Sequence, residues 1–225
     1  MAGENKVKPK GLKAKLENFW YHYKYHSIVI FMVFITVAVS LVQCAFKPDY
    51  DYKIIVATRS MTLSTPQMEA ITRELNRYGE DLTGDGEVNI LLVDCTLDGN
   101  TSDYQTLIAK QQKLQALLMT DIEAMLFLTD DKCLEWIEGL NQKSQFIANT
   151  GLPNNGGKGF NISKTHIIQN PKATVDVEKG LLWPDDLSIC RRKVKGTAFE
   201  EKDGVEKSVK NADAFIERII KNNSK

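Results

Sequence analysis

The chain has 225 residues, a length that fits one ordinary domain and an accessory segment. Its 29 basic and 29 acidic residues balance, which excludes the strongly basic composition of a general nucleic-acid-binding protein. The charge is uneven along the chain, because the first 26 residues hold six lysines and two acids, whereas residues 47–225 hold 23 basic and 27 acidic residues.

Residues 27–46, SIVIFMVFITVAVSLVQCAF, carry no charged side chain over 20 positions. Because about 20 apolar residues cross a hydrocarbon core roughly 30 Å thick as a helix, this segment predicts a transmembrane helix. The lysines before it predict a cytoplasmic N-terminus, with residues 48–225 outside the cytoplasm behind a signal anchor. An aromatic cluster, as expected of an interfacial belt, precedes the segment: Trp20, Tyr21, Tyr23 and Tyr25.

Two other interpretations of this segment stay open. A cleaved signal peptide would need a shorter apolar run and a small-residue cleavage site. A bacterial lipoprotein would carry lipid on Cys44, although Gln43 stands where a small residue normally precedes that cysteine. Upstream, residues 11–26 form either a short interfacial helix or a charged tail that sets the topology.

From Tyr50 onward, short apolar runs alternate with amphipathic segments. The first amphipathic segment has Thr65 as its predicted N-cap and Pro66 at the first helical position. A strand–helix order of this kind predicts an α/β fold in which helices cover a mainly parallel sheet. The predicted strands are 52–59, 87–97 and 123–130, and the predicted helices are 64–81, 102–121 and 130–147, the last capped by Asp130 or Asp131.

Two of these helices have an apolar stripe at helical spacing, which predicts the face that each turns toward the sheet. The stripe of the first helix is Met68, Ile71, Thr72, Leu75 and Tyr78, and that of the second is Leu107, Ile108, Leu114, Leu117 and Leu118.

The rhythm breaks at residues 149–186, which begin with a Gly- and Asn-rich stretch and predict an irregular insertion. Residues 187–199 alternate and are polar on one side, which predicts an edge strand. The basic run 190–195 within it is either a solvated strand face or a patch for an acidic partner. A closing helix is expected at 209–222, with Phe215, Ile216, Ile219 and Ile220 facing inward.

The run KIIVATR, VNILLVD and QKLQALLMTDIEAMLFLTDD resembles the first lobe of extracytoplasmic solute-binding proteins, which have the type II periplasmic-binding-like fold. The resemblance covers residues 50–145 and 187–222. The whole layout is also similar to bacterial single-pass membrane proteins of uncharacterised activity, which have a lysine- and aromatic-rich head. A second lobe that closes over a solute would need more chain than residues 149–186 supply.

If a ligand site exists, it is expected beyond the carboxyl ends of the parallel strands. The alternative for the same side chains is ordinary capping and turn chemistry. The candidate ligand-binding residues are Thr58, Arg59 and Ser60 after the first strand, Asp94 and Thr96 after the second, and Asp130 after the third.

The stretch YGEDLTGDGEVNI, residues 78–90, matches the first part of a twelve-residue calcium loop and is similar to dockerin-type and EF-hand-like loops. Gly86 takes the required turn position, but Leu92 stands where the bidentate glutamate belongs. A plain helix-to-strand turn is the alternative. The candidate calcium ligands are Asp81, Thr83, Asp85, Glu87 (through its backbone carbonyl) and Asn89.

Sequence motifs for catalysis are absent. The chain contains no G-x-S-x-G, H-E-x-x-H or C-x-x-C, and His166 is the one histidine of the external part. Cys95, Cys133 and Cys190 are expected to be buried thiols, with one disulfide as the alternative.

These observations predict a non-enzymatic, membrane-anchored external domain that binds, scaffolds or senses, with a calcium loop and with a surface or transporter protein as partner. The alternative function is a solute-binding component of a transporter.

Overall fold

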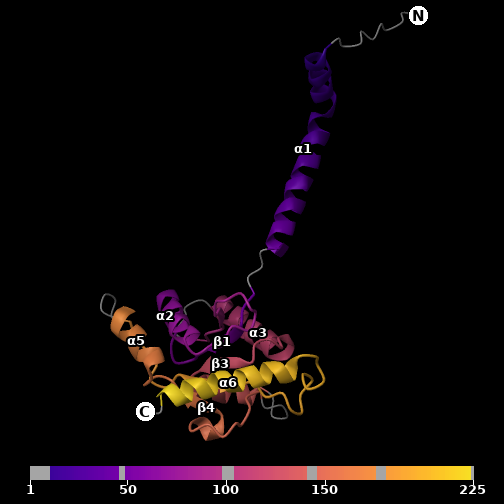
Figure 1. The fold of residues 1–225 in the computed structure, drawn as a ribbon. Coiled ribbons are helices and arrows are strands. Elements are labelled where there is room, and N and C mark those ends of the chain that lie inside the picture. Colours follow the sequence, from indigo (N-terminus) through magenta and orange to yellow (C-terminus); the bar gives the residue numbers. More distant parts are fainter. Residues whose placement is uncertain (1–10, 46–48, 98–103, 141–145, 176–180, 224–225) are drawn as a thin grey trace, which may run out of the picture. The chain divides into compact units, whose positions relative to one another are not determined.

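The computed structural model describes residues 11–45, 49–97, 104–140, 146–175 and 181–223 (Figure 1). The chain divides into two compact units, Met1–Pro48 and Asp49–Lys225. The elements in chain order are α1 (Leu12–Ala45), β1 (Tyr52–Ala57), α2 (Thr65–Asn76), β2 (Ile90–Asp94), α3 (Tyr104–Thr120), β3 (Leu126–Thr129), α4 (Asp131–Gly139), the 3-10 helix η1 (Asn155–Gly157), β4 (Gly159–Asn161), α5 (His166–Val175), β5 (Ser188–Arg191) and α6 (Val205–Asn223).

The first unit is dominated by α1, a single helix from Leu12 to Ala45. Its segment Phe19–Val42 is long and apolar enough to cross a membrane, judged by length and composition. Large apolar side chains such as Phe31 and Phe34 are exposed along it, as expected of a helix surrounded by lipid. Of the predicted head, the part from Leu12 on is helical and continuous with the predicted span. Residues 1–10 of the head and Phe46, the last residue of the predicted span, lie outside the described residues.

The second unit is built on a five-stranded sheet with the order β2-β1-β3-β5-β4. Strand β1 runs parallel to both β2 and β3, so the predicted parallel core of the fold is confirmed. Strand β5 runs antiparallel to β3, and β4 runs antiparallel to β5. The sheet is therefore mixed, with its parallel part formed by the first three strands.

The prediction that residues 187–199 form an edge strand is wrong. The strand there, β5, is short and lies inside the sheet between β3 and β4. The side chains of Arg191 in β5 and of Arg192 just after it suggest a solvent-facing side in the sequence, but partners within the protein bind them. Arg191 pairs with Asp213 of α6, and the fully buried Arg192 binds carbonyl groups of Leu117 and Asp121.

The description of residues 149–186 as irregular is also wrong in part. This segment contributes the 3-10 helix η1, the outer strand β4 and the helix α5. Strand β4 has three residues and begins at Gly159, so it is too short to show a period-2 pattern in the sequence. Its place in the sheet depends on the pairing with β5, which lies far along the chain.

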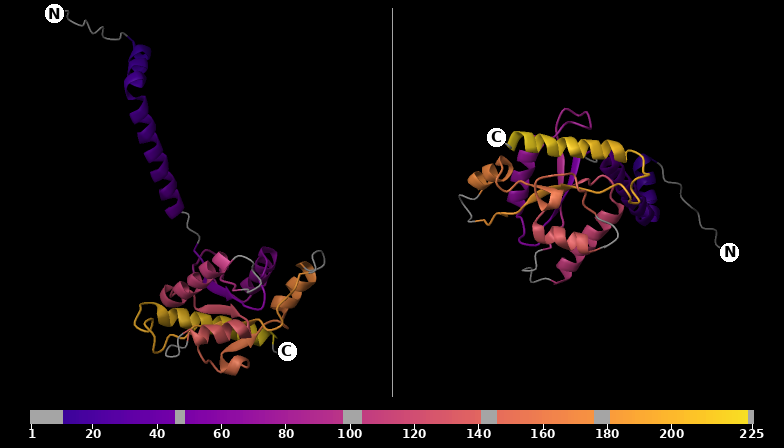
Figure 2. Two further views of the ribbon diagram at one scale, coloured as in Figure 1. Left: turned by 180° about the vertical axis from the view of Figure 1, so that it is seen from behind. Right: turned by 90° about the horizontal axis from the view of Figure 1, so that it is seen from below.

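Helices cover both faces of the sheet, and the right-hand view of Figure 2 shows α6 on one side of the strands and α3 with α4 on the other. One apolar cluster includes Ile71 and Leu75 of α2 with Phe215 and Ile216 of α6. The second cluster includes Leu114 and Leu118 of α3 together with residues of α4. The predicted inward face of the closing helix is confirmed, since Phe215, Ile216 and Ile219 are buried and Ile220 packs against the same cluster.

Two helix ends differ from prediction. Helix α2 has Ser64 rather than Thr65 as its N-cap, and Ser64 donates its backbone N–H and its hydroxyl to Gln67 Oε1 at 2.9 and 2.8 Å. Helix α4 is capped by Asp130, one of the two predicted residues, but it ends at Gly139 rather than near 147. Ile147 instead forms an antiparallel bridge with Arg192.

Candidate functional site

Asp130 is the centre of the polar cluster at the carboxyl ends of β1 and β3. It is fully buried. Its Oδ2 accepts hydrogen bonds from the backbone N–H groups of Arg59 and Ser60 at 2.7 and 2.6 Å, and its Oδ1 accepts one from Cys133 N at 2.7 Å. Both oxygens therefore hold the chain together, joining the turn after β1 to the first turn of α4.

The two threonines of the cluster also bind internally. The hydroxyl of Thr58 donates to Met61 O at 2.6 Å and lies 3.4 Å from the hydroxyl of Thr96, and both residues are buried. The Asp94 carboxylate forms an ion pair with Lys110 of α3 at 2.8 Å. Partial burial raises the pKa of Asp94, but the hydrogen bonds from Lys110 and Thr96 outweigh it and hold that pKa below its ordinary value.

The structure thus brings together five of the six predicted ligand-binding residues, namely Thr58, Arg59, Ser60, Thr96 and Asp130, and Asp94 borders them by accepting a hydrogen bond from Thr96 N at 2.9 Å. Two neighbours were not predicted. The Arg59 guanidinium lies 5.6 Å from the ring centre of Trp136, and Asp186 accepts a 3.4 Å hydrogen bond from Asp131 N. Burial and the negative charge of Asp130 raise the pKa of Asp186. Neither contact follows from local pattern, since Arg59 and Trp136, like Asp131 and Asp186, are far apart in the sequence.

The predicted calcium loop is a tight turn held by its own carboxylates. Asp81 accepts hydrogen bonds from Gly84 N at 2.6 Å and Gly86 N at 2.8 Å, and both glycines have positive φ. Asp85 accepts hydrogen bonds from Glu87 N at 2.9 Å and from Asn89 Nδ2 at 3.3 Å. These contacts are the local backbone bonding that a turn requires.

A carboxylate outside the predicted ligand set anchors this loop. Asp51, just before β1, accepts hydrogen bonds from Leu82 N at 2.6 Å, Thr83 N at 2.9 Å and Asn89 N at 2.7 Å. Partial burial raises the pKa of Asp51, but these backbone hydrogen bonds outweigh it, so that its pKa is lowered overall. No local pattern signals this role, because Asp51 precedes the loop by about thirty residues, whereas the side chains that shape a turn usually bond backbone only a few residues away.

Calcium binding by Asp81, Thr83, Asp85, Glu87 and Asn89 stays a prediction. Leu92, at the last ligand position of the loop, lies inside β2. Within the described ranges, no group of three or more His, Cys, Asp or Glu side chains is arranged to hold a metal ion. Asp51 is the carboxylate that reaches the loop from outside, and it does so through hydrogen bonds to backbone N–H groups.

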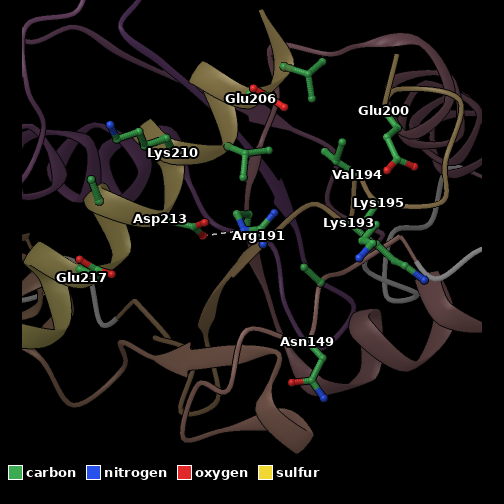
Figure 3. Close-up of a pocket in the computed structure, with 14 residues that line it drawn as sticks. Asn149, Arg191, Lys193, Val194, Lys195, Glu200, Glu206, Lys210, Asp213 and Glu217 are labelled. Carbon is green, nitrogen blue, oxygen red and sulfur yellow. Dashed lines mark ion pairs between the residues drawn. The ribbon is translucent and has the colours of Figure 1, made fainter. Parts of the chain in front are cut away.

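An open groove of about 870 Å³ lies at the other end of β3 (Figure 3). Arg191, which pairs in register with Leu126 at the start of β3, stands in this groove and forms an ion pair with Asp213 of α6 at 2.6 Å. Basic and acidic side chains both surround the pair, so the groove presents both charges (Figure 3). The charged lining residues are Arg191, Lys193, Lys195, Glu200, Glu206, Lys210, Asp213 and Glu217.

The three cysteines of the second unit are buried free thiols, as predicted. Burial raises the pKa of Cys95 to about 11 and that of Cys133 and Cys190 to about 12. Thiols that stay protonated and inaccessible are poor nucleophiles, so these residues serve packing.

Comparison with known proteins adds no family to this picture. No protein-family model, no curated protein and no solved structure matches the chain. The resemblance to a solute-binding lobe therefore stays a prediction, and the arguments about function rest on the geometry of the strand ends and of the groove.

Proposed function

We propose that the chain is a single-pass membrane protein whose second unit, Asp49–Lys225, lies outside the cytoplasm and binds another protein as a scaffold or sensor. The helix α1 supplies the apolar length for the anchor. The lysine excess of residues 1–26 supports a cytoplasmic N-terminus, because positive charge is retained on that side of the membrane.

The observation that carries the proposal is the burial of Asp130 and the hydrogen bonds that its carboxylate accepts. A cleft for a small solute needs polar groups that are free to receive the solute. The Asp130 carboxylate is fully buried, and three backbone N–H groups occupy its two oxygens. The cluster at the strand ends therefore caps the fold internally and does not offer free groups to a solute. This favours a binding or scaffolding domain over a solute-binding component of a transporter.

The groove beside α6 is the surface that fits a protein partner. It is open, and both lysines and carboxylates surround the Arg191–Asp213 pair. A surface with both charges matches a peptide segment that also carries both, and complementary charge sets specificity and association rate. Nucleic acid is disfavoured as a partner, because the carboxylates of the groove would repel its phosphates.

The test is a charge reversal in the groove of the full-length chain, followed by chemical cross-linking in native membranes. We expect Lys193→Glu with Lys195→Glu to abolish a cross-linked protein adduct that the unmodified chain forms. Lys207→Glu is the matched control, because Lys207 is exposed on α6 but does not line the groove. An adduct that survives the reversal, or that the control also abolishes, would remove the groove from the proposal.

The alternative, a solute-binding component of a transporter, is tested by thermal unfolding with a panel of small solutes. A solute that binds the folded domain raises its melting temperature by mass action. We expect no solute to do so, and a shift that Arg59→Ala removes would favour the transporter alternative.

A further inference from the structure

The two edges of the sheet differ in how their backbone hydrogen-bonding groups are covered. At the outer edge of β4, Asn154 exchanges backbone hydrogen bonds with Gly159, at 2.9 Å from Asn154 N and 3.2 Å from Gly159 N. The side chain of Asn154 accepts a further hydrogen bond from Asn161 N at 2.9 Å. The loop before β4 thus occupies the backbone groups that a further strand would need.

The outer edge of β2 has no such cover among the described residues. In a parallel pair, alternate residues direct both backbone groups toward the partner strand. Asn89 O accepts from Asp51 N, and Cys95 N donates to Val56 O, so the odd-numbered residues face β1. Ile90, Leu92 and Asp94 therefore face outward. Within the part of the chain that the structure describes, one contact is made there, from Lys113 Nζ to Asp94 O at 3.0 Å.

The side chains of β2 give this edge little protection. The strand ILLVD contains no proline and no charged residue before Asp94, and Leu91, Leu92 and Val93 are half-buried. Natural sheets usually blunt an open edge with lysine, proline or a bulge, because unpaired backbone groups beside apolar side chains recruit another strand. An edge left in this state is a surface that fits a strand from another chain.

We propose that the β2 edge pairs with the β2 edge of a second copy of this chain, in antiparallel orientation about a two-fold axis at Leu92. Leu92 then lies opposite its own copy, and their outward backbone groups satisfy one another. Ile90 lies opposite Asp94, whose carbonyl exchanges the Lys113 ammonium for the backbone N–H of Ile90. The two sheets continue as one.

Charge complementarity supports a second copy as the occupant. The exposed Glu87 lies just before β2, whereas Lys110 and Lys113 of α3 lie at its far end, where both contact Asp94. Antiparallel pairing brings Glu87 of one strand beside the far end of the other, where Lys113 adds a positive charge beyond the Lys110–Asp94 ion pair. An anchor of the kind proposed above would raise the effective concentration of the copies, but the pairing rests on the strand edge alone.

The experiment is sedimentation of the full-length chain in detergent micelles over a range of concentrations, combined with amide hydrogen exchange. We expect a reversible dimer whose formation slows exchange at Leu92. Leu92→Pro removes the outward N–H and should raise the dissociation constant by about tenfold or more, since two intermolecular hydrogen bonds are lost. Thermal unfolding checks that this variant folds. Leu91→Pro is the contrasting variant, because its N–H faces β1 and its loss should destabilise the monomer.

A charge exchange gives a second test that leaves the backbone intact. Glu87→Lys alone and Lys113→Glu alone should each weaken the dimer by about threefold, and the two together should restore it. A chain that stays monomeric at every concentration would overturn the proposal. A dimer that is indifferent to both Leu92→Pro and the charge exchange, or a monomer whose β2 edge accepts only a different extended peptide, would overturn it equally.

Discussion

At the carboxyl end of β3, Asp130 is buried and binds three backbone N–H groups, whereas at the amino end of the same strand Arg191 and Asp213 meet in an open groove. Both regions are rich in polar side chains. In the first, those side chains complete hydrogen bonds of the fold. In the second, Arg191 and Asp213 pair with each other, and the surrounding charged side chains, such as Lys195 and Lys210, are exposed. Residue type alone therefore does not separate a binding surface from an internal cap, but the partners of each polar atom do.

The largest expected effect is at Asp130. Asp130→Ala removes a buried carboxylate that accepts from three backbone N–H groups, of which that of Cys133 is buried and those of Arg59 and Ser60 are partly buried, so we expect the free energy of unfolding to fall by about 3 kcal/mol. Urea unfolding of the second unit measures this. Asp131→Ala is the matched control, because Asp131 is exposed and should change stability by less than about 0.5 kcal/mol. Equal effects at the two positions would mean that the strand-end cluster is not an internal cap.

A smaller effect is expected at Asp51. Asp51→Asn should lower the free energy of unfolding by about 1.5 kcal/mol near neutral pH, since it weakens the three backbone contacts to the calcium-like loop. The folded pKa of Asp51 lies below its ordinary value. Its contribution is therefore fully present above the unfolded pKa, about 3.9, and is lost as the pH falls through the folded pKa.

Unfolding measured as a function of pH tests the sign of this effect. The stability difference between the unmodified domain and Asp51→Asn should be constant near neutral pH and should shrink below about pH 4. A difference that grows on acidification would contradict the role given to Asp51.

Calcium binding at the same loop should increase the stability of the domain by a further, modest amount. We expect calcium to raise the melting temperature of the 49–225 fragment. At a calcium concentration tenfold above the dissociation constant, the free energy of unfolding should increase by about 1.4 kcal/mol. Asp85→Ala should abolish the shift, because Asp85 is a predicted ligand. A calcium-independent melt, or a shift that persists in the variant, would leave the loop as a turn held by Asp51.

The smallest effect is expected in the groove. A double-mutant cycle of Arg191→Ala and Asp213→Ala should give a coupling energy of about 0.5 kcal/mol, because Asp213 is 41% exposed and solvent screens the pair. Unfolding of the four proteins measures it. A coupling as large as the effect of Asp130→Ala would show that the groove is a structural pair rather than an accessible surface.

The sequence predicts most features that depend on local periodicity. The apolar helix, the three parallel strands and the inward face of α6 follow from composition and periodicity, because each depends on residues that are close in the chain. The interior place of β5 does not follow, since the polarity of Arg191 and Arg192 is satisfied by α6 and by the end of α3. For the same reason the role of Asp51 and the cover that Asn154 gives to β4 depend on distant partners.

The position of β5 has a consequence for how the protein is made. This strand comes near the end of the chain yet lies between β3 and β4, and Arg192 beside it holds carbonyl groups at the end of α3. During synthesis from the N-terminus, β3 therefore has an unpaired side until β5, about sixty residues further along the chain, has emerged. Contacts between residues so far apart in sequence are slow to form, so the pairing of β3 with β5 is expected to follow the pairing of β1 with β2 and β3.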